Sequence, residues 1–479
     1  MPRIKSRANN LIHFKSVLIA VAIFLFYLSI ISVNDLLKNV VNNTTATKEN
    51  ISVAEYFLGR PKPTTTLILF TNNAEMRYGG GFIGSVGLIR ADGGKINVDP
   101  IRSVYYYDHR LDGKPAVDKM PPEFKNIAED MRLRDSGIYL DWAEDAKNAA
   151  RYFQLESGIK PDNVMAVTPM VLKEILKKTG PIELKSYGLT ITADNILQTL
   201  QLEVESGSDK QAGDDPKTIL GVLGNEILAL LSRQSLSELA GYADILSPMF
   251  EQKQLMLYAG DLEVQKKLQK LSATGELAKF DGNYLLLAEE NVGANKSSPY
   301  VEQTIDQVVT INDAGEAVVD LKLTRTHTSD YQHKYLDPHL GRERWLVAEN
   351  INYAKLALSR GSQLIDYDKS IGDIKQSEES GRAVVAFWFS TAPKQSKTIS
   401  LRYKLPYSYK MDRRLVVNSL FEKQTGAVWQ KINQRVVVPA NYRLVAASTP
   451  HVVYNVSNMT TVSEATTNKN HLTSFIYER

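Results

Sequence analysis

The longest apolar run of the chain lies close to its start. Residues 17–33 (VLIAVAIFLFYLSIISV) are almost all apolar, and no charged residue occurs from Ser16 to Asn34. A helix rises about 1.5 Å per residue, so this run covers most of a hydrocarbon core about 30 Å thick. The pattern predicts one transmembrane helix over residues 17–34, and no second run of this length follows.

The charges before this run set its predicted orientation. Basic residues and no acidic ones precede it, at Arg3, Lys5, Arg7 and Lys15. Basic flanks stay in the cytoplasm, so we expect a basic tail inside over residues 1–16 and the bulk of the chain outside the cell membrane. A cleaved signal peptide has the same charge pattern, but Ser32-Val33-Asn34 is a poor cleavage site. We therefore expect an uncleaved, single-pass anchor that contacts membrane lipid.

The next part of the chain alternates between strand and helix patterns. Residues 35–62 are polar and predict a stalk, and an α/β domain of mixed sheet and helices is predicted over residues 63–290. Apolar strand patterns occur at residues 64–70, 82–90, 95–98, 101–107 and 163–167. Helical spacing occurs at residues 142–153, 169–178, 216–232, 248–258 and 262–271. Asp141 and Glu144 have the form of a capping box at one helix start.

Beyond residue 290 the pattern is that of strands. Residues 301–311 and 316–326 flank Asn312-Asp313-Ala314-Gly315, which is a hairpin signal. Helical periodicity is sparse in this part. We therefore predict an all-β sandwich of immunoglobulin-like type over residues 291–479.

Composition excludes several classes of protein. Lys and Arg number 57 and Asp and Glu 54, so the net charge of +3 does not indicate a nucleic-acid partner. The chain of 479 residues has no cysteine, which excludes disulfides, thiolate metal sites and a cysteine nucleophile. No Walker loop and no Gly-x-Ser-x-Gly elbow occurs. Composition and these motifs therefore assign no activity.

Several segments together carry a resemblance to a known family. Residues 67–96 contain Asn-Asn-Ala-Glu-x-Arg followed by Gly-Gly-Phe-Ile-Gly-Ser, and residues 159–184 follow as a middle motif. Residues 291–296 have the form Asn-x-Gly-x-Asn-Lys, and residues 423–426 have the form Lys-Gln-x-Gly. In this order they resemble the bacterial domain-of-unknown-function 4012 family. The resemblance implies membership over most of residues 63–479 and no particular reaction.

A more distant resemblance implies a mechanism. The order of elements resembles the LytR–CpsA–Psr phosphotransferases, which move glycopolymers from a polyprenyl-pyrophosphate carrier to the bacterial cell wall. Where that family has Pro-Arg-Asp, this chain has Pro100-Ile101-Arg102-Ser103, and the helix expected to be rich in arginine has Lys217 as its only base. The resemblance therefore implies the same scaffold, but with few of the charged residues that would hold a pyrophosphate.

The loop after the first predicted strand holds most of the candidate ligand-binding residues. Asparagine and carboxylate oxygens suit a hard cation such as Mg²⁺, and arginine suits phosphate or carboxylate. These candidates are Asn72, Asn73, Glu75 and Arg77. The alternative is that Glu75 and Arg77 pair with each other or cap nearby backbone.

The glycines that follow admit two interpretations. Gly79, Gly80 and Gly81 could cradle an anion such as pyrophosphate, because glycine permits positive φ and close backbone approach. The alternative, which we favour, is a tight turn under a packed neighbour. A dinucleotide site is excluded by context, because a strand-like segment rather than a helix follows Gly79-x-Gly81-x-x-Gly84.

Two further clusters complete the candidates. Arg102, Asp108 and Arg110 lie at the end of a predicted strand with three tyrosines, and could bind a sugar phosphate or form a solvated strand end. His327, His333 and His339 recur every six residues, but this spacing lacks the regularity of a preorganised zinc site. We therefore predict no metal-ligating residues and assign no catalytic residue.

Two functions remain open from the sequence. The first is a non-catalytic cell-envelope protein that binds glycan, a lipid carrier or another protein on a LytR–CpsA–Psr-like scaffold. The second is a Mg²⁺-dependent phosphotransferase, with Arg77 and Arg102 on pyrophosphate and Glu75 or Asp108 on the metal. Convergence of Arg77 and Arg102 at an apolar groove would favour the second.

Overall fold

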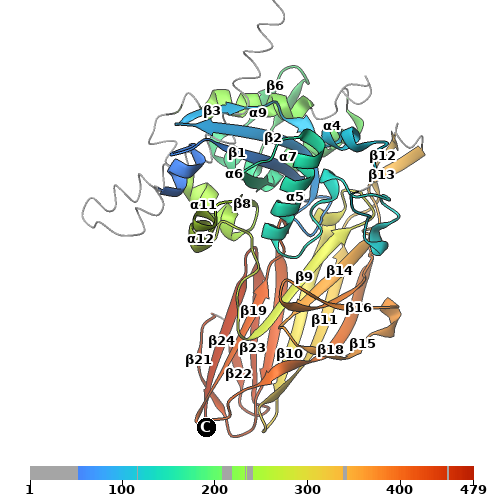
Figure 1. Ribbon diagram of the computed structural model, residues 1–479. Coiled ribbons are helices and arrows are strands. Elements are labelled where there is room, and N and C mark those ends of the chain that lie inside the picture. The colour runs from blue at the N-terminus through green and yellow to red at the C-terminus, as the bar shows by residue number, and fades with distance from the viewer. Residues whose placement is uncertain are drawn as a thin grey trace, which may run out of the picture.

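The computed structural model describes residues 52–115, 117–207, 218–231, 234, 241–337, 342–449 and 452–479. These residues form an α/β domain, which is at the top in Figure 1, and an elongated two-sheet β domain below it. Among them, no helix is both long enough and apolar enough to be a candidate membrane span. The predicted span over residues 17–34 lies outside the described residues.

The α/β domain alternates strands and helices as its sequence predicts. Its strands are β1 (Thr64–Asn72), β2 (Phe82–Asp92), β3 (Lys95–Val98), β4 (Arg102–Ser103), β5 (Asn163–Val167), β6 (Ile182–Leu184), β7 (Leu189–Ile191) and β8 (Leu255–Ala259). Its helices are α4 (Tyr105–Asp108), α5 (Trp142–Ser157), α6 (Pro169–Thr179), α7 (Ile196–Ser206), α9 (Thr218–Leu231), α11 (Ala243–Glu251) and α12 (Leu262–Lys270). Short 3₁₀ turns are η1 (His109–Leu111), η2 (Pro122–Phe124) and η3 (Leu133–Asp135).

The main sheet of this domain is covered on both faces. Its strand order is β3-β2-β1-β5-β8, with β4 paired to β2, and only the β1–β5 pair is parallel. Alternation along β1 sends Leu67 and Leu69 into a core with α5, and Ile68 into a core with α6, α7 and α9. The predicted mixed α/β class is confirmed.

The C-terminal domain consists mainly of two seven-stranded sheets. One has the order β15-β18-β11-β10-β20-β23-β22 and the other β16-β17-β14-β9-β19-β24-β21. A separate hairpin pairs β12 (Gln332–Asp337) with β13 (Arg342–Val347), and 3₁₀ turns are η4 (Ser298–Tyr300) and η5 (Lys369–Ile371). The other strands are β9 (Asn283–Asn291), β10 (Val301–Ile311), β11 (Glu316–His327), β14 (Asn352–Leu358), β15 (Gln363–Tyr367), β16 (Lys375–Glu379), β17 (Arg382–Trp388), β18 (Ser396–Ser408), β19 (Arg414–Glu422), β20 (Gln430–Val437), β21 (Arg443–Ala447), β22 (Val453–Asn455), β23 (Thr460–Thr467) and β24 (His471–Glu478).

The two large sheets enclose one apolar core, so the domain is a β-sandwich. Leu287 on β9, Val309 on β10 and Phe475 on β24 all lie in that core. The two sheets together have fourteen strands, whereas an immunoglobulin domain has seven to nine in all, and the pairs β10–β20 and β9–β19 are parallel. The expected sandwich is therefore present, and the expected immunoglobulin type is wrong.

Three expected boundaries differ from the structure. Strand β9 pairs with β14 and β19, so the sandwich begins at Asn283 and the predicted boundary at residue 290 cuts through a strand. The predicted strand over residues 101–107 is only β4, after which the chain turns into α4. Only residues 248–251 of the predicted helix over residues 248–258 are helical, as the end of α11, and residues 255–258 belong to β8.

The two domains share buried side chains and are also joined by a hairpin. Tyr284 and Tyr353 of the sandwich lie in the same apolar cluster as Leu67 and Trp142 of the α/β domain. The β12–β13 hairpin extends from the sandwich to the side of the α/β domain (Figure 1), where β12 packs against α7. The two domains are therefore joined through a buried apolar cluster and through the hairpin of the second domain.

Candidate functional site

Three of the sequence motifs meet where the two domains join. The side-chain amide of Asn73 donates to the carbonyl oxygen of Gly426 at 2.9 Å. The amide of Gln424 donates to the carbonyl oxygens of Arg77 and Glu289 at 3.1 and 2.8 Å. The loop after β1, the end of β9 and the loop after β19 are thus held together by side chains of the motifs themselves.

A chain of buried ion pairs runs through this junction. Arg77 donates to Glu75 at 2.9 Å and to Glu290 on β9 at 3.2 Å. Lys296 donates to the other oxygen of Glu75 at 2.5 Å and lies 3.4 Å from Glu205 on α7. Two cations from different domains therefore hold the same carboxylate.

Burial and neighbouring charge act against each other in this network. Burial raises the pKa of Glu290 to about 7, although the neighbouring Arg77 guanidinium opposes that rise. Burial alone would lower the pKa values of Arg77 and Lys296, but their carboxylate partners raise both. Both cations therefore stay charged, and Glu290 titrates near neutral pH.

A second ion-pair group lies next to the first. Arg134 donates to the buried Asp108 at 2.6 Å, and its Nε lies 3.5 Å from an oxygen of Asp135. Burial raises the pKa of Asp135 to about 6, while Arg134 and Arg77 act in the opposite direction. These groups come from η3, in the loop before α5, and from α4.

A cavity of about 1210 Å³ opens between the sheet and helices α6, α7 and α9. This volume exceeds the roughly 300–1,000 Å³ usual for pockets that hold drug-sized ligands. Its inner wall is apolar and comes from the sheet and three helices. The side chains on that wall are Phe70, Met165, Val167, Val171, Leu172, Ile175, Leu197, Leu200, Val204, Leu223, Ile227 and Leu255.

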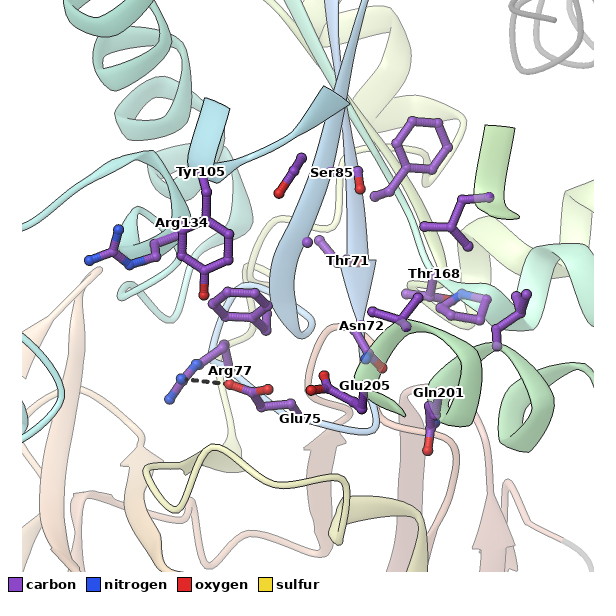
Figure 2. A pocket seen from close by; sticks show the side chains of 18 of the residues that line it. Thr71, Asn72, Glu75, Arg77, Ser85, Tyr105, Arg134, Thr168, Gln201 and Glu205 are labelled. Atoms are coloured by element: carbon purple, nitrogen blue, oxygen red, sulfur yellow. Dashed lines mark hydrogen bonds and ion pairs between the residues drawn. The ribbon is translucent and has the colours of Figure 1, made fainter. Parts of the chain in front are cut away.

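Charged and aromatic side chains line the other end of the cavity. They come from both domains and include Glu75, Arg77, Tyr105, Arg134, Asp135, Glu205, Lys296, Tyr335, Asp337 and Arg344. Figure 2 shows Tyr105 and Arg134 on one side, Gln201 and Glu205 of α7 on the other, and the Glu75–Arg77 pair between them. The cavity thus joins a polar mouth to an apolar interior.

Some of the predicted loop residues lie in this mouth. Asn72, Glu75 and Arg77 line the cavity, and the Asn72 side chain also accepts the amide N–H of Ala74 at 3.0 Å. Asn73 points instead to the β-domain loop. Glu75 and Arg77 pair with each other as the alternative interpretation expected, while both still face the cavity.

The glycines form a packed turn. A Cβ on Gly81, where φ is +133°, would lie 2.5 Å from the carbonyl carbon of Asn72. One on Gly79 would lie 2.8 Å from an Asp145 oxygen, and one on Gly80, where φ is +103°, would lie 3.0 Å from Thr425. None of the three lines the main cavity. The structure therefore favours the turn over the anion cradle.

The second candidate cluster does not join the first. Arg102 and Arg110 stack on the ring of Tyr106, with guanidinium carbons 4.4 and 4.7 Å from its centroid. Neither lines the cavity, and Asp108 is buried behind Arg134. Arg77 and Arg102 therefore do not converge on one ligand, contrary to the arrangement that the phosphotransferase hypothesis requires.

The histidines are placed apart from one another. His327 is buried and contacts the carbonyl oxygen of Ala348 at 3.0 Å, whereas His333 lies on β12 and His339 is outside the described residues. Within the described part of the chain, no three His, Asp or Glu side chains form a group that could hold a metal ion.

Sequence reasoning missed several residues of the mouth. Arg134, Tyr335 and Arg344 carry no local signal, because they come from segments without a recognised pattern. Lys296 did have a signal, since it ends the Asn-x-Gly-x-Asn-Lys motif. Because this polar motif lies beyond the predicted α/β domain, it could have indicated that the site is shared between the two domains.

Asp135 should give folding a measurable pH dependence. Its folded-state pKa of about 6 lies above the ordinary 3.8, so the folded chain keeps a proton that the unfolded chain releases. As the pH rises from below 3.8 to above 6, this lowers the free energy of unfolding by about 3 kcal/mol in total, of which about 2 kcal/mol falls between pH 4 and 6. Asp135→Asn should remove that part of the slope in urea unfolding, and the exposed Asp112→Asn should keep it. Equal slopes in wild type and Asp135→Asn would contradict this assignment.

The fold and site define an α/β domain with a large internal cavity, completed at its mouth by a β-sandwich. Residues 62–204 match the family described as "Protein of unknown function (DUF4012)". The match bears out the resemblance that the motifs indicated, and it covers the first part of the α/β domain. No curated protein matches the chain.

Solved structures give only weak similarities. A protein of Legionella pneumophila described as nutrient-binding is 10% identical over 38% of this chain and 68% of its own, with a TM-score of 0.27. A Bacillus subtilis protein described as a transcriptional regulator is 12% identical over 47% and 85%, with a TM-score of 0.25. An M1 zinc metallopeptidase of Deinococcus radiodurans is 12% identical over 38% and 43%, with a TM-score of 0.20. The chain spans less than half of that peptidase, and scores this low support no inference.

Proposed function

We propose that this is a membrane-anchored protein of the cell envelope whose α/β domain binds a lipid carrier, such as a polyprenyl-linked glycan, without acting on it. The observation that carries the proposal is the cavity of about 1210 Å³ with an apolar interior and a charged mouth. The apolar tail would lie between the sheet and helices α6, α7 and α9. The polar head group would remain at the mouth, beside Arg77 and Lys296.

The charges at the mouth favour binding over group transfer. Arg77, Lys296 and Arg134 each contact at least one carboxylate. A clamp for pyrophosphate needs cations whose charge is directed at the ligand, and here it is largely neutralised by the protein. Binding energy would then come mainly from burial of the tail, at about 25 cal/mol for each Å² of apolar surface.

Thermal unfolding of the full chain in amphipol tests the proposal. We would add a short polyprenyl phosphate, the polyprenol of equal length, or inorganic pyrophosphate with Mg²⁺. Both tailed ligands should raise the unfolding midpoint, because a ligand that binds only the folded chain stabilises it. Inorganic pyrophosphate should not.

Two outcomes would overturn the proposal. Stabilisation by inorganic pyrophosphate alone would place binding in the head group rather than the tail. Release of phosphate from a polyprenyl pyrophosphate in the presence of Mg²⁺ would establish the phosphotransferase alternative.

A further inference from the structure

One face of the β12–β13 hairpin exposes large apolar side chains. Leu336 is 65% exposed and Trp345 38%, and Tyr331, just before β12, is 51% exposed. The rings of Tyr331 and Trp345 lie 5.6 Å apart, so they form one patch with each other. We name Tyr331, Leu336 and Trp345 the hairpin patch.

The opposite face of the same hairpin lines the cavity mouth. Lys334 pairs with Trp345 across the two strands, and the next pair along is Tyr335 with Arg344. Successive residues of a strand point to opposite faces, so Tyr335 and Arg344 face the cavity while Trp345 faces outward. The hairpin patch and the side chains that line the mouth therefore lie on opposite faces of the same two-stranded hairpin.

The hairpin is held against both domains. The Tyr335 hydroxyl lies 3.4 Å from a Glu205 oxygen on α7, and Arg344 donates to the carbonyl oxygen of Ala294 at 3.1 Å. Helix α7 also forms part of the apolar wall through Leu200. A surface that contacts the hairpin patch is thus placed beside both the mouth and the helix that covers the tail site.

We propose that the hairpin patch rests in the interfacial layer of a lipid bilayer and brings the mouth to the membrane. The inference rests on the proposed function, since a tail that fills the cavity must come from a membrane. Tyr and Trp are the residues that favour membrane–water interfaces, because each has an apolar ring and a polar atom. The 17 residues 35–51 would reach at most about 60 Å when fully extended, which limits how far the predicted anchor lets the described domains lie from the bilayer.

The charge on this face predicts the character of the contact. Lys334 forms an ion pair with Glu343, which lies on the same outward face, and this pair adds no net charge. Contact with the bilayer should therefore depend on apolar burial rather than on anionic lipid. It should change little with salt, unlike the binding of a basic patch.

Quenching of tryptophan fluorescence by bilayer lipid tests the contact. The full chain would be reconstituted in bilayers with and without brominated phosphatidylcholine. Wild type should show quenching that is largely lost in Trp345→Phe and retained in Trp429→Phe. Trp429 is a matched control, because it is 40% exposed and lies outside the hairpin. Equal quenching in wild type and Trp345→Phe would overturn the proposal.

A loading experiment separates this inference from the proposed function. Leu336→Glu should slow transfer of a fluorescent polyprenyl lipid from vesicles into the reconstituted chain several-fold. The same variant should bind a short, water-soluble analogue as wild type does. Unchanged transfer would refute a role of the patch in loading. Failure of wild type to bind either lipid would refute the proposed function and leave the quenching result to decide the membrane contact.

Discussion

Replacing Arg77 with alanine should destabilise the protein more than any other single change at the mouth. Arg77 is 8% exposed and holds Glu75 and Glu290 from two different domains. Its removal leaves the buried Glu290 without the arginine that pairs with it, although Lys296 still contacts Glu75. Removing one partner of a buried pair typically costs about 3–5 kcal/mol, and we expect a loss in this range by urea unfolding.

A matched arginine gives the control for this experiment. Arg102→Ala should change the free energy of unfolding by less than about 0.5 kcal/mol, because Arg102 is exposed. If Arg77→Ala had the same free energy of unfolding as wild type, the ion pairs would not be what joins the two domains. A stable Arg77→Ala that had lost only ligand binding would instead mark Arg77 as a free head-group clamp.

Filling the cavity should have the largest effect on binding. Leu172 lies on α6 and lines the apolar wall. Leu172→Trp would place an indole ring in space that the tail is proposed to occupy, and the cavity has room for it without overpacking the core. We expect at least about tenfold weaker binding of polyprenyl phosphate, or about 1.4 kcal/mol, with little change in stability.

The same substitution outside the cavity serves as its control. Leu155→Trp changes an exposed position on α5 and should bind the lipid as wild type does. The readout is lipid-dependent stabilisation of the full chain. Equal stabilisation of wild type and Leu172→Trp would show that the tail lies elsewhere.

The strands that could be predicted have local signals. β1 and β2 are apolar, β-branched runs bounded by polar loops, and the turn at residues 312–315 fixes the β10–β11 hairpin. The segment that contains β8 misled the prediction, because a short apolar run suits a buried strand and a buried helix equally. Periodicity could not show that β8 pairs with β5, since that contact is nonlocal.

Helix capping shows how a correct local pattern can have a nonlocal partner. Asp141 caps α5 as predicted, by accepting the backbone N–H of Ala143 at 2.9 Å. Glu144 does not complete the expected box, because its carboxylate accepts the hydroxyl of Ser380 at 3.0 Å. A residue of the sandwich therefore binds the Glu144 carboxylate, which the sequence pattern had assigned to the helix cap.

The sequence likewise predicted some residues of the candidate site but not their partners. Glu75 and Arg77 were found because carboxylate and guanidinium groups follow a strand end, where ligands commonly bind in α/β sheets. Their buried partners Glu290 and Lys296 are more than 200 positions away along the chain. Arg102 was included because it lies in a predicted strand segment, at the place where the LytR–CpsA–Psr family has Pro-Arg-Asp, but its guanidinium stacks on Tyr106 instead.

Photo-crosslinking tests the central claim most directly. A polyprenyl phosphate with a diazirine near the tail end would be irradiated with the full chain in bilayers, and the labelled peptides would be identified by mass spectrometry. The account predicts labels on the cavity-lining stretches of α6, α7 and α9, and their loss in Leu172→Trp. Labels confined to residues 17–34 or to the outer surface of the sandwich would contradict a lipid-binding cavity.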